Sequence, residues 1–131
     1  MIIVLDASAA MEIVLEKDKA EQFRGYLKES DIVIAPDIFP SEITNVFWKY
    51  ASFSELSGEV CGKGILYCLD LVDDYITTKD LCREVFAESI KEKHSAYDLF
   101  YLVLARRYNA SILTNDKGIK KIAKSMRISV L

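Results

Sequence analysis

The segment Ile2-Ile3-Val4-Leu5-Asp6 opens the chain and decides the fold that we expect for it. Four consecutive apolar residues, three of them β-branched, are typical of a strand that is buried on both faces. Similar runs recur at Ile32–Ala35 and Ser111–Thr114, and segments of helical periodicity lie between them. Strands separated by helices predict a parallel sheet with helices on both faces. The sequence therefore predicts an α/β fold.

The whole chain fits one domain, residues 1–131, because it shows no linker, repeat or low-complexity segment. We expect a three-layer α/β/α sandwich around a central, mostly parallel five-stranded sheet. The strands are expected at Ile2–Leu5, Ile32–Ala35, Tyr75–Thr77, Ser111–Thr114 and Ile128–Leu131. The helices are expected at Ala7–Glu29 (interrupted near Lys17), from Pro40 onward, and at Ser54–Leu71, Lys79–Lys93, Ser95–Tyr108 and Lys117–Ser125. Three glycines predict that the helix in Ser54–Leu71 is bent or broken.

The composition excludes several classes of protein. Hydrophobic residues make up 51% of the chain and charged residues 28%, which is typical of a globular domain. The longest apolar run, Leu99–Ala105, is far shorter than the roughly 20 residues that span a bilayer. No signal peptide is recognisable, so we expect a soluble, cytoplasmic protein with no membrane partner. We expect the three cysteines to pack in the core as small apolar residues. The single histidine, His94, is expected to be a polar loop residue before a helix.

The net charge of −3 argues mildly against nucleic-acid binding, but the charge is unevenly distributed. Residues 1–90 hold 8 basic and 17 acidic side chains, whereas residues 91–131 hold 9 basic and 3 acidic ones. The C-terminal part is therefore a candidate surface for a polyanion. Its cationic candidates are Lys117, Lys120, Lys121, Lys124 and Arg127, for which an ordinary solvated helix face is the alternative.

Four acidic residues are predicted to lie at one edge of the sheet. Asp6 directly follows the first strand, and Asp116 follows Ser111–Thr114, so both lie at carboxyl ends of strands. Glu42 opens the helix that starts from the same edge. Asp98 begins a helix that must return antiparallel to its following strand, which brings it to that edge as well. In parallel sheets this edge carries the functional crevice.

Each of these acids also has a purely structural interpretation. Asp6 and Asp116 are suited to cap the helices that follow them, and Glu42 lies in a first helical turn, where the helix dipole favours an acid. Ser95 and Asp98 fit a capping box. These structural interpretations explain each acid singly but not all four together, because carboxylates that are brought together repel one another unless a cation lies among them.

Carboxylate oxygens without cysteine or histidine favour Mg²⁺ or Mn²⁺. Such ions bind phosphates and activate water for attack on a phosphodiester. Carboxylates alone would repel a polyanion, so the acids indicate metal-dependent phosphoryl chemistry and the basic segment indicates a polyanionic substrate.

Four short segments resemble the signature segments of PIN-domain nucleases, and most closely those of VapC-type toxins of toxin–antitoxin systems. They occur in the family's order and spacing and extend over the whole chain. These segments are Val4-Leu5-Asp6-Ala7-Ser8-Ala9, Pro40-Ser41-Glu42-Ile43-Thr44-Asn45, Tyr97-Asp98-Leu99-Phe100-Tyr101 and Leu113-Thr114-Asn115-Asp116.

The resemblance implies a PIN-like fold and a Mg²⁺- or Mn²⁺-dependent endoribonuclease. It implies that the catalytic and metal-binding residues are Asp6, Glu42, Asp98 and Asp116. Ser8 and Thr114 match hydroxyl positions beside this site, and Asn45 matches a polar position one turn after the first glutamate. The resemblance also implies an RNA substrate, a homodimer and a small antitoxin protein as a partner.

Two other functional classes remain open at this point. A receiver-type signalling module also has an acidic pocket, but it needs an acidic pair after the first strand, where only Asp6 stands, and an aspartate after the third, where Thr77 and Thr78 follow. A catalytically silent binding protein on the same scaffold is the other alternative, against which the presence of all four acids argues.

Overall fold

A computed structural model describes all 131 residues, and its centre is a sheet of four parallel strands. The strands are β1 (Ile2–Leu5), β2 (Ile32–Pro36), β3 (Asp74–Ile76) and β4 (Ser111–Leu113), in the order β3-β2-β1-β4. The central strand β1 pairs with β2 from Ile2 opposite Ile32 and with β4 from Ile3 opposite Ser111. Most residues of β1 and β2 are buried, as their apolar sequences predict.

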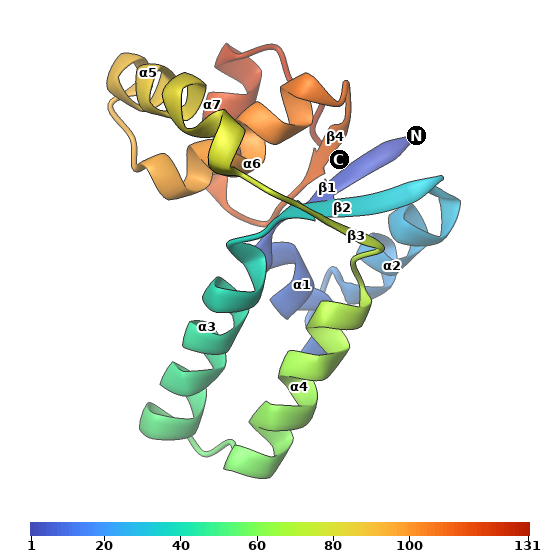
Figure 1. Ribbon diagram of the computed structural model, residues 1–131. Coiled ribbons are helices and arrows are strands. Elements are labelled where there is room, and N and C mark those ends of the chain that lie inside the picture. Colours follow the sequence, from blue (N-terminus) through green and yellow to red (C-terminus); the bar gives the residue numbers. More distant parts are fainter.

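Helices cover both faces of this sheet, so the predicted three-layer α/β/α architecture is confirmed (Figure 1). One layer holds α1 (Ala7–Val14), α2 (Ala20–Glu29), α3 (Phe39–Phe53) and α4 (Gly58–Asp70). The other holds α5 (Cys82–Glu92), α6 (Ala96–Arg107) and α7 (Lys117–Ser125), with a short 3₁₀ helix, η1 (Lys79–Leu81), before α5. No helix is long and apolar enough to cross a membrane.

The core forms one cluster of 33 buried residues. Its centre on one side is α6, which packs against β1, β2 and β4. Because α6 is covered by α5 and α7 on its outer side, the residues from Leu102 to Ala105 are buried all around the helix. This explains why the longest apolar run of the chain lies in this helix.

The expectation of a fifth strand at Ile128–Leu131 is wrong. This segment contributes one isolated parallel bridge, between Val130 and Ile112. Two backbone hydrogen bonds hold it, from Ile112 N to Ser129 O at 2.8 Å and from Leu131 N to Ile112 O at 3.0 Å. Both bonds are made by Ile112, so the contact with β4 is confined to one residue and does not extend into a strand pairing.

The glycine-containing helix α4 is continuous, contrary to the expectation of a bend or break. It begins at Gly58, after the cap Ser57, whose side chain accepts a hydrogen bond from the Val60 amide. Gly64 faces α3, and a Cβ atom there would lie 2.5 Å from the buried ring of Phe47. The glycine therefore permits the close approach of α3 and α4, which run side by side as a hairpin (Figure 1).

Candidate active site

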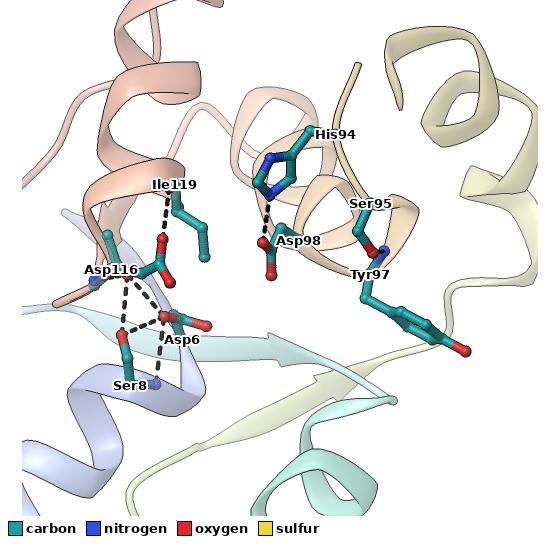
Figure 2. Close-up of polar contacts among 9 residues, drawn as sticks. Asp6, Ser8, His94, Ser95, Tyr97, Asp98, Asp116 and Ile119 are labelled. Carbon is teal, nitrogen blue, oxygen red and sulfur yellow. Dashed lines mark hydrogen bonds and ion pairs between the residues drawn. The ribbon is translucent and has the colours of Figure 1, made fainter. Parts of the chain in front are cut away.

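All four predicted acids lie at the carboxyl edge of the sheet, each at or near the beginning of a helix. Asp6 follows β1 and caps α1, and Asp116 follows β4 and caps α7. Glu42 and Asp98 lie in the first turns of α3 and α6. Figure 2 shows Asp6, Asp98 and Asp116 directed toward a common space.

Asp6 is the most thoroughly anchored of these side chains. Its Oδ2 atom accepts hydrogen bonds from Ser8 Oγ at 2.5 Å, from Ser8 N at 3.3 Å and from Thr114 Oγ1 at 2.7 Å. Oδ1 receives no hydrogen bond from the chain and faces the common space (Figure 2). Burial raises the pKa of Asp6 above its ordinary value and Asp98 raises it further, while the Ser8 and Thr114 hydrogen bonds lower it.

Thr114 joins the ends of the two strands β1 and β4. It is fully buried, donates to Asp6 and accepts a hydrogen bond from the backbone N–H of Asp116 at 3.0 Å. Ser8 likewise donates to Asp6 and accepts from Asn115 N at 2.9 Å. Since each hydroxyl has one proton and gives it to Asp6, both hydroxyls serve to hold this carboxylate in place.

Glu42 lies beside Asp6 and Asp98, close enough for their charges to affect its protonation. Burial raises the pKa of Glu42 to about 7, and the negative charges of Asp6 and Asp98 contribute to this rise. Its Oε1 atom and the Tyr101 hydroxyl oxygen are both buried and neither has a hydrogen bond of good geometry, but the hydroxyl lies near enough to Glu42 to lower its pKa in part. Burial also raises the pKa of Tyr101, with contributions from Glu42, Asp6 and Asp98, so the phenol stays protonated next to the acids.

Asp98 has a partner that the sequence analysis did not assign to the site. The Nε2 atom of His94 lies 2.6 Å from Asp98 Oδ2 (Figure 2). The expected capping box is absent: Ser95 caps α6 by accepting from the Tyr97 amide instead of that of Asp98, and the Asp98 side chain pairs with His94. The interpretation of His94 as a plain loop residue missed this contact. Its signal in the sequence was the four-residue spacing to Asp98.

Asp116 has both a structural and a site-facing role. Its Oδ1 atom accepts a hydrogen bond from Ile119 N at 2.9 Å, which caps α7, as the structural interpretation predicts. Oδ2 receives no hydrogen bond from the chain, and Asp116 is joined to Asp6 through Thr114. The cap thus leaves one oxygen available to the common space.

The remaining predicted residues are exposed, except for Lys120, which is half-buried. Asn45 lies on α3 one turn after Glu42, in a surface hollow of about 560 Å³ that Trp48 also lines. The apolar face of α7 packs through Ile119, Ile122 and Ala123, so its lysines lie on the outer face. Five cationic side chains were predicted to bind RNA, and none of them forms a salt bridge. They are Lys117, Lys120, Lys121, Lys124 and Arg127.

The donor chemistry of the site fits a hard divalent cation. All four acids offer oxygen, Asp6 and Asp116 each keep one free oxygen, and the orphaned Oε1 of Glu42 lacks a partner that a cation would supply. As placed, no three acidic, histidine or cysteine side chains form a group that could hold a metal ion. Binding would therefore require rotation of some of these side chains.

The fold and the site define a class of α/β domains that carry clustered carboxylates at the carboxyl edge of a parallel sheet. The chain belongs to the PIN domain family, whose sequence pattern matches residues 3–125. The resemblance inferred from the four signature segments is thereby confirmed.

Individual relatives agree with this assignment. Ribonuclease VapC3 of Pyrobaculum aerophilum is 23% identical over 124 residues, which are 91% of this chain and 92% of that protein. The crystal structure of PAE2754 from the same organism superimposes with a TM-score of 0.77 at 16% identity, covering 98% of this chain and 81% of that one. VapBC2 from Rickettsia felis, bound to a promoter DNA fragment, gives a TM-score of 0.72 at 17% identity, covering 100% and 98%.

Proposed function

We propose that this protein is a Mg²⁺- or Mn²⁺-dependent endoribonuclease and the toxin of a VapBC-type toxin–antitoxin pair. The observation that carries the proposal is the meeting of Asp6, Glu42 and Asp98 on a PIN fold, where the charges of Asp6 and Asp98 raise the pKa of Glu42 and the charge of Asp98 raises that of Asp6. No lysine or arginine forms an ion pair with any of them. Unneutralised carboxylates in this arrangement favour a bound cation.

In this proposal Asp6, Glu42, Asp98 and Asp116 hold the ion, which supplies charge neutralisation at the phosphate and activation of water. Ser8 and Thr114 fix Asp6 through their hydrogen bonds to Oδ2, so that Oδ1 remains directed toward the ion. Glu42, beside Asp6 and Asp98, orients the attacking water that the ion would activate. Cleavage leaves a 5′-phosphate and a 3′-hydroxyl, and Asn45 lies where it can contact the RNA.

The partners follow from the same family assignment. The Rickettsia felis neighbour is a VapBC complex, which supports a small antitoxin as the partner of this chain. A homodimer is proposed because large apolar side chains are exposed on the helices. They include Trp48, Phe53, Leu66, Tyr67, Phe86, Ile90 and Tyr97. An RNA substrate and an antitoxin both imply a cytoplasmic site of action.

The test is cleavage of a single-stranded RNA with Mg²⁺ or Mn²⁺ and with EDTA. Wild-type protein should cleave only with the metal, and Asp98→Asn should abolish cleavage while the chain stays folded. Asp80→Asn, which removes an exposed carboxylate in η1 that forms no ion pair, is the control and should retain full activity. Full activity of Asp98→Asn, or cleavage in EDTA, would contradict the proposal.

A further inference from the structure

Glu12, on α1, is a buried acidic side chain that the proposed mechanism does not use. It is 7% exposed, and the only other acidic side chain buried to this degree is Asp6. Both carboxylate oxygens of Glu12 are hydrogen-bonded. Oε2 accepts from the backbone N–H of Lys19 at 2.9 Å, and Oε1 accepts from Asn115 Nδ2 at 3.2 Å. Burial of a charge requires such partners, so these two contacts account for its place in the fold.

The two partners of Glu12 also contact each other. Lys19 Nζ donates a hydrogen bond to Asn115 Oδ1 at 3.1 Å. Glu12, Asn115 and Lys19 therefore form a closed ring of three hydrogen bonds, which ties the turn between α1 and α2 to the loop between β4 and α7. An exposed lysine side chain is ordinarily free to adopt many rotamers. Here the ring holds both its backbone and its ammonium group.

Asn115 connects this ring to the acid cluster. It stands between Thr114 and Asp116, and its backbone N–H donates to Ser8 Oγ, which in turn donates to Asp6. The ammonium group of Lys19 is thereby held beside the loop that carries two of the site's polar residues. This places one fixed positive charge at the border of a cluster that is otherwise negative.

The charge of Lys19 is not used within the chain. Its ammonium contacts the neutral amide oxygen of Asn115 and no carboxylate, while the oxygens of Glu12 are taken by two N–H groups. An ammonium group has three N–H donors, so two remain for a ligand. A fixed, unpaired cation with free donors beside a phosphodiesterase-type acid cluster is suited to a phosphate group.

We propose that Lys19 binds a backbone phosphate of the RNA next to the scissile bond, and that Glu12 is the positioning residue that holds Lys19 and Asn115 there. The proposal rests on the ribonuclease function proposed above. It adds a phosphate contact from the acidic N-terminal part of the chain, on a different element from the lysines of α7. Lys17 lies two residues earlier and is also exposed, and its ammonium group forms one hydrogen bond, with the Tyr50 hydroxyl at 3.4 Å.

The test measures binding of a fluorescein-labelled oligouridylate by anisotropy as a function of salt. Mg²⁺ is left out so that the labelled RNA is not cleaved during the measurement. Binding is measured in Ca²⁺, which also takes oxygen ligands, and separately in EDTA. Lys19→Ala should flatten the slope of log affinity against log salt by about 0.7, the value for one phosphate on a single strand. Lys17→Ala, the matched control, should leave the slope unchanged.

Glu12→Gln supplies a second readout. Its amide keeps one acceptor oxygen but replaces the other, so one bond of the ring is lost. We expect its salt slope to move toward that of Lys19→Ala, and the double variant Glu12→Gln/Lys19→Ala to show no further flattening. A role of Glu12 in stability alone would lower the unfolding midpoint and leave the salt slope at the wild-type value.

The outcomes separate this inference from the proposed function. Equal slopes for wild type, Lys17→Ala and Lys19→Ala overturn the role of Lys19, as does equal flattening in both variants. Neither result affects the cleavage assay, on which the ribonuclease proposal depends. Failure of the wild-type protein to bind the oligouridylate at low salt overturns the inference, and absence of metal-dependent cleavage overturns the function.

Discussion

The Nε2 atom of His94 lies 2.6 Å from Oδ2 of Asp98, one helical turn further along the chain. Lys93 ends α5 in a left-handed conformation with φ 53°, and His94 follows it in the loop before α6. The contact therefore joins this loop to the first turn of α6. His94 is half-buried and holds one oxygen of Asp98, while the other oxygen receives no hydrogen bond from the chain. The histidine therefore restricts the rotamers of a proposed metal ligand.

His94→Ala should weaken metal binding, because a ligand that loses its outer partner is no longer oriented. Mutations of such partners typically cost 10- to 100-fold in metal affinity, and we expect a loss of roughly 10-fold here because Asp98 is only half-buried. Titration of Mn²⁺ by calorimetry measures this change directly. His94→Gln retains an N–H donor of similar reach and should recover part of the affinity. Equal affinities of all three proteins would show that the contact does not orient Asp98.

The stability of the metal-free protein should fall as the pH rises from about 5 to 7.5. The pKa of Glu42 is raised from 4.5 to about 7 in the fold, so the folded state retains a proton that the unfolded state has lost. Stability therefore decreases with rising pH through this window, by on the order of 2 kcal/mol for this partly buried group. The raised pKa of Asp6 acts in the same direction. Urea denaturation in EDTA at several pH values measures the effect.

Glu42→Gln is the control for this pH dependence, because an amide of the same shape does not titrate. The variant should lose most of the decrease between pH 5 and 7.5 and be more stable than wild type at pH 8 in EDTA. Mg²⁺ should narrow that difference, since it stabilises the ionised wild-type cluster by binding the folded state. A pH profile that is identical in the two proteins would contradict the raised pKa of Glu42.

Much of the fold could be predicted because its signals are local. The apolar runs at Ile2–Leu5 and Ile32–Ala35 gave their strands to within a residue, and the interruption near Lys17 separates α1 from α2. The errors lie where tertiary contacts decide. The apolar segment around Val130 has the local sequence of a strand but forms a single β-bridge. Glycine lowers the helix propensity of α4, but Gly64 allows the close packing against Phe47 that stabilises the helix.

The placement of the acids was predictable for a topological reason: parallel strands bring their carboxyl ends to one edge. The polar residues that surround Asp6 were less predictable from the sequence. Ser8 and Thr114 were suggested by the family resemblance, whereas the Glu12–Asn115–Lys19 ring joins positions up to 103 residues apart and has no local signal. His94 lies in the loop before α6, as predicted, but its contact with Asp98 is made by a side chain across the helix start and has no signal beyond the four-residue spacing. The catalytic roles of all these residues stay predictions.

Gly64→Ala should destabilise the hairpin of α3 and α4. The new Cβ atom would lie 2.5 Å from Cζ and 2.6 Å from Cε1 of Phe47, whose ring is buried. Overpacking costs about 1–3 kcal/mol, and a contact this short with a buried ring belongs in the upper part of that range, above the gain of about 1 kcal/mol from replacing a helical glycine with alanine. Gly62→Ala is the matched control on the same helix, because nothing lies within 4 Å of its Cβ position. We expect urea denaturation to show a less stable Gly64→Ala and a more stable Gly62→Ala.

The double variant Lys120→Ala/Lys121→Ala tests the basic face of α7. Neither lysine forms a salt bridge, and both follow Asp116, a proposed metal ligand, on a helix whose other face is in the core. If both bind phosphates, the salt slope for single-stranded RNA should flatten by roughly 1.4, or 0.7 for each phosphate. Lys28→Ala is the control, because α2 ends shortly before β2 and places this charge near the opposite, amino edge of the sheet. An unchanged slope in the double variant would assign Lys120 and Lys121 to an ordinary solvated helix face, and RNA contacts would then have to come from elsewhere on the rim, such as Lys19.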